Sequence, residues 1–125
     1  MSVERDLFYA ETHEWVKYLD GGRALIGISD HAQEQMGDVA FINLCDEGEI
    51  ISAGDEVGDI ESIKAVSEIY SPVSGTVSKV NDELLEDPAA LNSDPYGAWL
   101  LELEGVTENN SLMDADEYEK FIEEE

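Results

Sequence analysis

Short apolar runs separated by turn residues recur along the chain, and their spacing predicts a protein built mainly of β-strands. Segments 14–19 and 23–28 flank the turn Asp20-Gly21-Gly22, a pattern typical of a β-hairpin. Strands that follow one another closely through Gly-rich turns favour an antiparallel sandwich or barrel. The other predicted strands are 39–44, 49–52, 57–63, 65–70, 76–80 and 98–103, and 88–97 is expected to be a loop.

Capping residues predict a few short helices between and after these strands. Ser29 is placed to cap a helix that ends at Met36, before Gly37. Segment 81–86 predicts one helical turn that begins at Asn81. Near the end of the chain, Asp114-Ala115-Asp116-Glu117 resembles a capping box. Three apolar residues then share one helix face, which we expect to dock on the body: Tyr118, Phe121 and Ile122.

Aromatic residues in or beside the predicted strands are expected to form part of the core, because strand aromatics are usually packing residues. They are Trp15, Phe41, Tyr70 and Trp99.

The composition adds a strong acidic excess, with 31 Asp+Glu against 6 Lys+Arg and a formal net charge of -25. This sign excludes nucleic acid and an anionic membrane surface as partners, because both need a basic footprint. Hydrophobic residues make up 42% of the chain, which favours a packed core over disorder. The 125 residues suffice for one domain, with an expected core of about 9–104 and an acidic helix of about 111–125.

Cellular location is predicted from the cysteine and from hydropathy. Cys45 is the single cysteine, so the chain forms no internal disulfide, and it is expected to be a small buried hydrophobe. No apolar run is long enough to span a bilayer, and the first residues lack an apolar signal core. A reduced, cytoplasmic protein is the expectation.

One lysine stands out against the acidic background. Between Ala24 and Ser78 the chain carries 11 acidic residues and one basic residue, Lys64, which lies between two predicted strands without Gly, Pro or Asn beside it. This position predicts a tight hairpin tip by elimination. Two interpretations stay open from spacing alone: a solvated lysine paired with Glu61 or Glu68, or an attachment point for a carried group on a stiff stalk.

The sequence gives little indication of a catalytic site or a metal site. His13 and His31 are not accompanied by a ligand cluster of zinc-like spacing, so no metal site is predicted. Neither a nucleophile-elbow motif nor a dinucleotide-binding glycine motif is present. No catalytic residue is assigned.

Several motifs resemble one family. Glu61-Ser62-Ile63-Lys64-Ala65 is similar to the lipoylation signature of glycine cleavage system H proteins. Four further segments are similar to the same family. They are Thr12-His13-Glu14-Trp15-Val16, residues 27–39, Tyr70-Ser71-Pro72-Val73-Ser74-Gly75 and Leu91 to Leu100.

This resemblance implies a barrel-sandwich hybrid with an added C-terminal helix and lipoate bound covalently to Lys64. The family carries an aminomethyl group from the P protein (glycine decarboxylase) to the T protein (aminomethyltransferase). The L protein (dihydrolipoamide dehydrogenase) then reoxidises the arm, and lipoate-attaching enzymes are further partners. The loaded arm is expected to dock in a surface cleft, for which Glu14 and His31 are the candidates. Structural roles for both residues stay open.

Four alternatives compete with this interpretation. Biotin carriers typically have Met-Lys-Met where this chain has Ile63-Lys64-Ala65. Lipoyl domains of 2-oxoacid dehydrogenases typically have Asp-Lys-Ala and belong to longer chains. An all-β interaction module would never modify the lysine. An H-like protein that only relays lipoate to other enzymes would share every motif.

Overall fold

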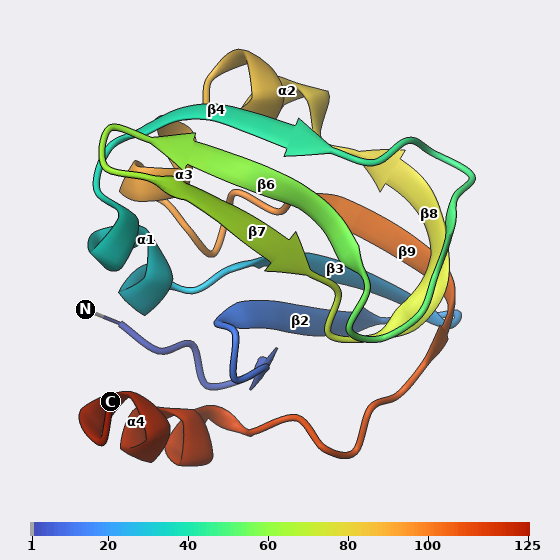
Figure 1. The fold of residues 1–125 in the computed structure, drawn as a ribbon. Coiled ribbons are helices and arrows are strands. Elements are labelled where there is room, and N and C mark those ends of the chain that lie inside the picture. Colours follow the sequence, from blue (N-terminus) through green and yellow to red (C-terminus); the bar gives the residue numbers. More distant parts are fainter. Residues whose placement is uncertain (1) are drawn as a thin grey trace.

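The computed structural model describes residues 2–125, which form two antiparallel sheets and four short helices. The larger sheet has the strand order β1-β2-β3-β9-β8-β5 and the smaller sheet the order β4-β6-β7 (Figure 1). The predicted fold class, mainly β with short helices, is therefore confirmed. The strands are β1 (Phe8–Tyr9), β2 (Glu14–Leu19), β3 (Arg23–Ile28), β4 (Val39–Leu44), β5 (Ile50–Ile51), β6 (Glu56–Ser62), β7 (Val66–Tyr70), β8 (Ser74–Val80) and β9 (Leu101–Thr107).

Helices form where the capping residues predicted them. Ser29 accepts a hydrogen bond from the Ala32 amide at the start of α1 (Asp30–Met36), and Asn81 caps α2 (Asp82–Glu86). The last helix, α4 (Ala115–Glu123), begins with a complete capping box between Asp114 and Glu117. Helix α3 (Ala90–Ser93) was not predicted, because its segment has no side-chain cap and was expected to be a loop.

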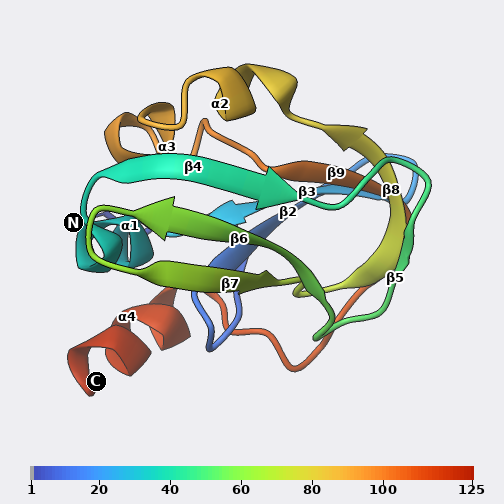
Figure 2. The same ribbon diagram turned by 45° about the horizontal axis from the view of Figure 1, so that its top comes forward.

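The main core lies between the two sheets, and a second cluster lies between the larger sheet and α4 (Figures 1 and 2). Side chains along β2 point alternately to opposite faces of the sheet, so this strand contributes residues to both clusters. Val16 faces the main core, whereas Trp15 faces the second cluster with Tyr9 and Tyr118. Glu14 shares the face of Val16 and therefore points between the sheets. This placement brings a carboxylate into the interior.

Two predicted strand features are wrong, and both have local causes. Phe41 is 63% exposed and does not belong to the core. A β-bulge between Val39 and Phe41 shifts the register, so Val39 and Ile42 point inward and Phe41 points out. The last strand covers Leu101–Thr107 instead of 98–103, because Leu100 bonds Ile26 outside the regular ladder.

The other aromatic predictions differ in outcome. Trp15 is 1% exposed and belongs to the second cluster, and the half-buried Trp99 packs against the same cluster. Tyr70 is half-buried, but neither core cluster of residues 2–125 includes it, and its hydroxyl bonds Glu68. Cys45 is also half-buried, packed against the main core. Strand β1 had no sequence signal of its own.

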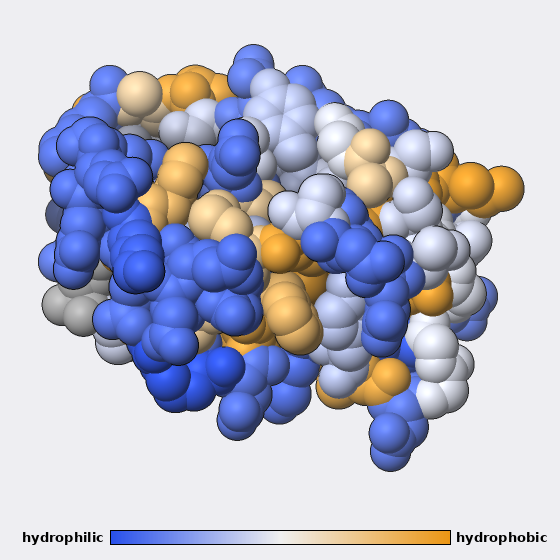
Figure 3. Space-filling view, turned by 90° about the horizontal axis from the view of Figure 1, so that it is seen from below, coloured by the Kyte–Doolittle hydropathy of each residue, from blue (hydrophilic) through white to orange (hydrophobic). Residues whose placement is uncertain are grey.

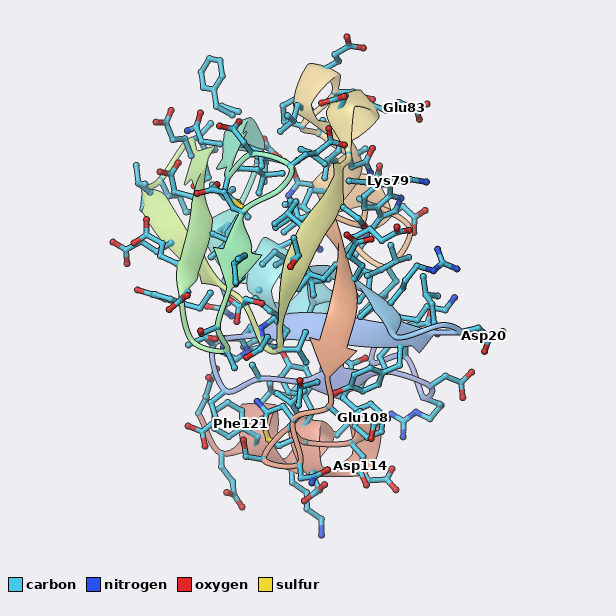
Figure 4. All side chains as sticks on the ribbon, turned by 90° about the vertical axis from the view of Figure 1, so that its right-hand side faces the viewer. Asp20, Lys79, Glu83, Glu108, Asp114 and Phe121 are labelled. Atoms are coloured by element: carbon cyan, nitrogen blue, oxygen red, sulfur yellow. The ribbon has the colours of Figure 1, made fainter. Side chains whose placement is uncertain are left out.

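The surface carries the acidic excess. Asp20 and Glu83 point away from the body into solvent (Figure 4), and Glu108 and Asp114 are also exposed. The face viewed from the side of α4 is largely hydrophilic, with smaller apolar areas (Figure 3). None of the helices in residues 2–125 is long and apolar enough to cross a membrane.

Candidate functional site: a lysine at a hairpin tip beside a cleft

Lys64 lies at the tip of the β6–β7 hairpin, as predicted. The backbone N–H of Ser62 donates to the Ala65 carbonyl at 2.9 Å, which closes a four-residue turn. The Ser62 hydroxyl accepts hydrogen bonds from the amides of Lys64 and Ala65, both at 3.2 Å. A serine side chain therefore stabilises a turn that lacks Gly and Pro.

The tip is also tied to the segment that follows α1. The amide of Ile63 donates to the carbonyl of Asp38 at 3.1 Å, which anchors the hairpin tip. The tip of the β6–β7 hairpin lies beside α1 (Figure 2). Gly37 ends α1 with a φ of 77°. A Cβ atom built on Gly37 would lie 3.1 Å from Cε of Lys64, so the glycine leaves room for the lysine chain. The stalk is stiff and the amine at its end is exposed.

The ion pairs found among residues 2–125 do not include Lys64. Neither Glu61 nor Glu68 is within 4.0 Å of its amine. The interpretation as a paired surface lysine therefore finds no support in this geometry.

A cleft of about 280 Å³ opens beside the lysine. Ile28, Ala32 and Met36 give it an apolar wall, and most of its other lining residues are polar. The remaining lining residues are Thr12, His13, Glu14, Gln35, Ser62, Lys64, Ala65, Ser67 and Glu68. The fold thus brings Lys64 and Glu14 to one cleft from positions 50 residues apart in the chain.

Glu14 is the buried carboxylate of this cleft, with 1% of the residue exposed. One of its oxygens accepts from the Thr12 hydroxyl, and the other accepts from the Tyr70 amide at 3.0 Å. Burial raises the pKa of Glu14 to about 7, and the hydrogen bonds oppose this rise only in part. The cleft therefore holds a carboxyl group without a basic partner.

His31 does not line the cleft. It lies buried on α1, and its Nε2 atom is 2.9 Å from Oε1 of Glu125. His13 takes the place by the cleft, with its Nε2 atom 2.8 Å from Oε2 of the same carboxylate. Burial lowers the pKa of His13 despite the neighbouring Glu125. The sequence motif around Glu14 contained His13, but nothing in it indicated that this histidine, and not His31, would reach the cleft.

Two antiparallel sheets, one of which ends in a hairpin with an exposed lysine beside a partly apolar cleft, form a lipoyl-domain-like fold. The family model for the glycine cleavage H-protein matches residues 7–125. The chain belongs to the glycine cleavage H-protein family.

Named relatives agree with this assignment over the full chain. The glycine cleavage system H protein of Thermoanaerobacter sp. (strain X514) is 46% identical over 127 residues, covering 100% of both chains. The mitochondrial glycine cleavage system H protein 2 of Arabidopsis thaliana is 51% identical, covering 98% of this chain and 80% of the relative. The crystal structure of a glycine cleavage system H protein from Mycobacterium marinum superposes with a TM-score of 0.89 at 36% identity. It covers 94% of this chain and 97% of its own.

Proposed function

We propose that this chain is the non-catalytic lipoyl carrier of a glycine cleavage system, with lipoate bound through an amide to Lys64. In this role it carries the aminomethyl group from the P protein to the T protein, and the L protein reoxidises it. The observation that carries the proposal is the exposed amine of Lys64 at a hairpin tip beside a cleft, which takes part in none of the ion pairs found in residues 2–125. Residues 1–125 would act as one lipoyl-carrier domain in the cytoplasm.

The residues around Lys64 suit such a group. An attaching enzyme needs a reachable amine, and Lys64 is exposed. A lipoyl arm has a hydrocarbon chain and a dithiolane ring, which match the apolar wall of Ile28, Ala32 and Met36. When attached, lipoate would supply the disulfide at which the carried group is taken up and, once that group is released, the dithiol that the L protein reoxidises. Because the arm is tethered, its effective concentration at each partner is high.

The cleft residues would hold the loaded end of the arm away from water. A protonated amine at that end would meet the carboxyl group of Glu14, which the Tyr70 amide and the Thr12 hydroxyl orient. A cation beside a buried carboxyl favours its ionised form. Glu14 therefore binds and orients, while His31 lies outside the cleft lining and would act only through α1.

The charge of -25 supports transient association with several partners. Long-range attraction raises the rate of encounter with basic surfaces and falls with salt. Rapid release suits a protein that must visit the P, T and L proteins in turn. Attachment of lipoate removes one positive charge and makes the carrier more acidic by about one unit.

The test is intact-mass measurement after incubation with a lipoate-attaching enzyme. The wild-type chain is expected to gain one lipoyl group, and Lys64→Arg none. Lys79→Arg is the matched control, because Lys79 is also an exposed strand-region lysine and points away from the body (Figure 4). An unmodified wild-type chain, or modification that survives Lys64→Arg, would overturn the assignment.

A second assay separates the carrier role from lipoate relay. Reconstituted glycine cleavage with P, T and L proteins is expected to proceed with the lipoylated wild type and to stop with Lys64→Arg. An H-like relay protein would instead pass its lipoyl group to another acceptor domain without supporting glycine cleavage. Circular dichroism of the variant checks that the fold is intact.

A further inference from the structure

Two histidines and a carboxylate from three separate elements converge behind the cleft. His13 lies in the turn before β2, His31 lies on α1, and Glu125 follows α4. One possible ligand atom of each residue lies within 4.8 Å of those of the other two. The two imidazole Nε2 atoms approach different oxygens of the same carboxylate, at 2.8 and 2.9 Å. No step of the proposed carrier function uses this arrangement.

The backbone and the surrounding hydrogen bonds hold His13 in place. His13 has a φ of 78°, a left-handed conformation that is uncommon for a residue other than Gly. Its Nδ1 atom lies 2.8 Å from the hydroxyl of Tyr118, which lies 2.6 Å from the hydroxyl of Ser29. In metal-binding histidines, the ring nitrogen that does not bind the metal is typically held by such a hydrogen bond, which orients the ring. Because hydroxyls both donate and accept, the network accommodates either tautomer of His13.

His31 directs its polar contacts into the same cluster. Its side chain is 9% exposed, and its Nε2 atom bonds Glu125. Its Nδ1 atom is the one buried side-chain N or O atom in residues 2–125 without a hydrogen-bond partner. The nitrogen of His31 that faces the cluster is therefore Nε2.

We propose that His13, His31 and Glu125 bind one divalent cation, with Zn²⁺ as the preferred ion. Two imidazole nitrogens and one carboxylate oxygen are ligands typical of zinc sites with an open fourth position. Imidazole also favours late transition metals over Mg²⁺ and Ca²⁺. The side chain of Glu125 is 39% exposed, so a water molecule reaches the fourth position.

The three ligand atoms lie within 4.8 Å of one another, so the site would form by adjustment of side chains that are already close together. Zn²⁺ bonds of about 2.0–2.1 Å place tetrahedral ligand atoms roughly 3.3 Å apart. The two nitrogen–oxygen contacts must therefore lengthen slightly, and the exposed Glu125 at the end of a helix has room to shift. The net charge of -25 raises the local concentration of cations around the whole chain. The paired imidazoles distinguish this site from the many surface carboxylates.

The bound cation would connect α4 to the wall of the cleft. His13 lines the cleft, and Glu125 continues from the end of α4, so metal binding joins two segments that side chains alone now connect. Because the ion binds the folded chain, it raises the temperature of unfolding.

The test uses the purified, unlipoylated chain after removal of metals with a chelator. Zn²⁺ is titrated in competition with a chromophoric chelator, and Co²⁺ serves as a spectroscopic probe. We expect one tight Zn²⁺ per chain and a Co²⁺ absorption band of the intensity that four-coordinate sites show. Glu125→Gln is expected to weaken binding at least tenfold and to remove the rise in unfolding temperature. Glu124→Gln carries the same charge change next to the site and is expected to bind as the wild type does.

Two results would overturn the proposal. Equal Zn²⁺ affinity in the wild type, Glu125→Gln and Glu124→Gln would show that only dispersed surface carboxylates bind. A weak Co²⁺ absorption spectrum typical of six-coordinate sites in the wild type would also show that the ion binds only dispersed surface carboxylates. His13→Gln provides a second test that keeps side-chain volume, and circular dichroism checks its fold. Because the experiment involves neither lipoate nor Lys64, its outcome is independent of the carrier function.

Discussion

The contact between Trp15 and Gly27 offers the sharpest test of how strand β2 is held in place. This strand also positions His13 and Glu14. The two residues face each other across the β2–β3 ladder. A Cβ atom on Gly27 would lie 2.4 Å from both Cε2 and Cζ2 of Trp15 and 2.7 Å from its Nε1. Gly27→Ala therefore places a methyl group inside the volume of the indole ring.

The indole cannot shift at low cost, because its N–H lies within hydrogen-bond distance of two carbonyls. They belong to Ile28 at 3.1 Å and Pro95 at 3.2 Å. Overpacking of a dense core costs about 1–3 kcal/mol. Loss of a buried hydrogen bond adds about 1 kcal/mol. We expect Gly27→Ala to lower the free energy of unfolding by roughly 2–4 kcal/mol.

This loss translates into a measurable change in the unfolding temperature. The entropy of unfolding is about 2.1 cal/mol/K per residue, so 1 kcal/mol corresponds to about 4 °C for a chain of 125 residues. The expected decrease in Tm is roughly 8–15 °C. Far-ultraviolet circular dichroism during heating or urea denaturation measures it without relying on the fluorescence of the affected tryptophan.

A double-mutant cycle isolates the contact. Trp15→Phe removes the atoms that the added methyl group would meet, at a cost of its own. In the Trp15→Phe background, Gly27→Ala is expected to cost at least about 1 kcal/mol less than in the wild type. An equal cost in both backgrounds, or no cost in the wild type, would refute the reasoning from this contact.

Three other predictions concern single side chains. Tyr118→Phe removes a buried hydroxyl that serves both His13 and Ser29, and we expect a loss of about 1–3 kcal/mol in urea denaturation; an unchanged midpoint would contradict this network. Asp114→Ala removes half of the α4 capping box and is expected to cost about 0.5–2 kcal/mol, measured the same way; an equal loss from the neighbouring Asp116→Ala would show that capping is not the cause. Phe41→Ser is expected to change stability by less than about 0.5 kcal/mol, because the ring is exposed; a loss typical of a core aromatic would show that Phe41 packs inward.

Features governed by neighbouring residues were predictable from the sequence. Ser29 and Asp114 mark helix starts because a cap acts within three residues. The tip at Lys64 followed from two strands that left no other place for a turn, and the family motifs pointed to the same lysine. The side chain of Ser62, which stabilises this turn, is part of the motif, but its hydrogen bonds become visible only in the folded chain.

Features that depend on register or on distant contacts were not predictable. Val39 and Phe41 would share one face of a regular strand, but the bulge between them turns Phe41 to solvent while Val39 stays buried. His13, His31 and Glu125 are separated by 18 and 94 residues, so no local spacing indicated their convergence. In both cases the outcome depends on how whole elements pack, which sequence periodicity does not report.

Burial, and not charge alone, distinguishes Glu14 from the other acidic residues of the chain. The chain has 31 acidic residues, and within residues 2–125 only Glu14 and Glu102 are buried. Glu102 contacts Arg23 and Ser78, so a nearby cation compensates its charge. Glu14 accepts hydrogen bonds from a hydroxyl and an amide, and burial raises its pKa to about 7. A buried carboxyl group without a cation is poised to receive one, and under the proposed carrier function the carried amine would arrive in the cleft beside Lys64.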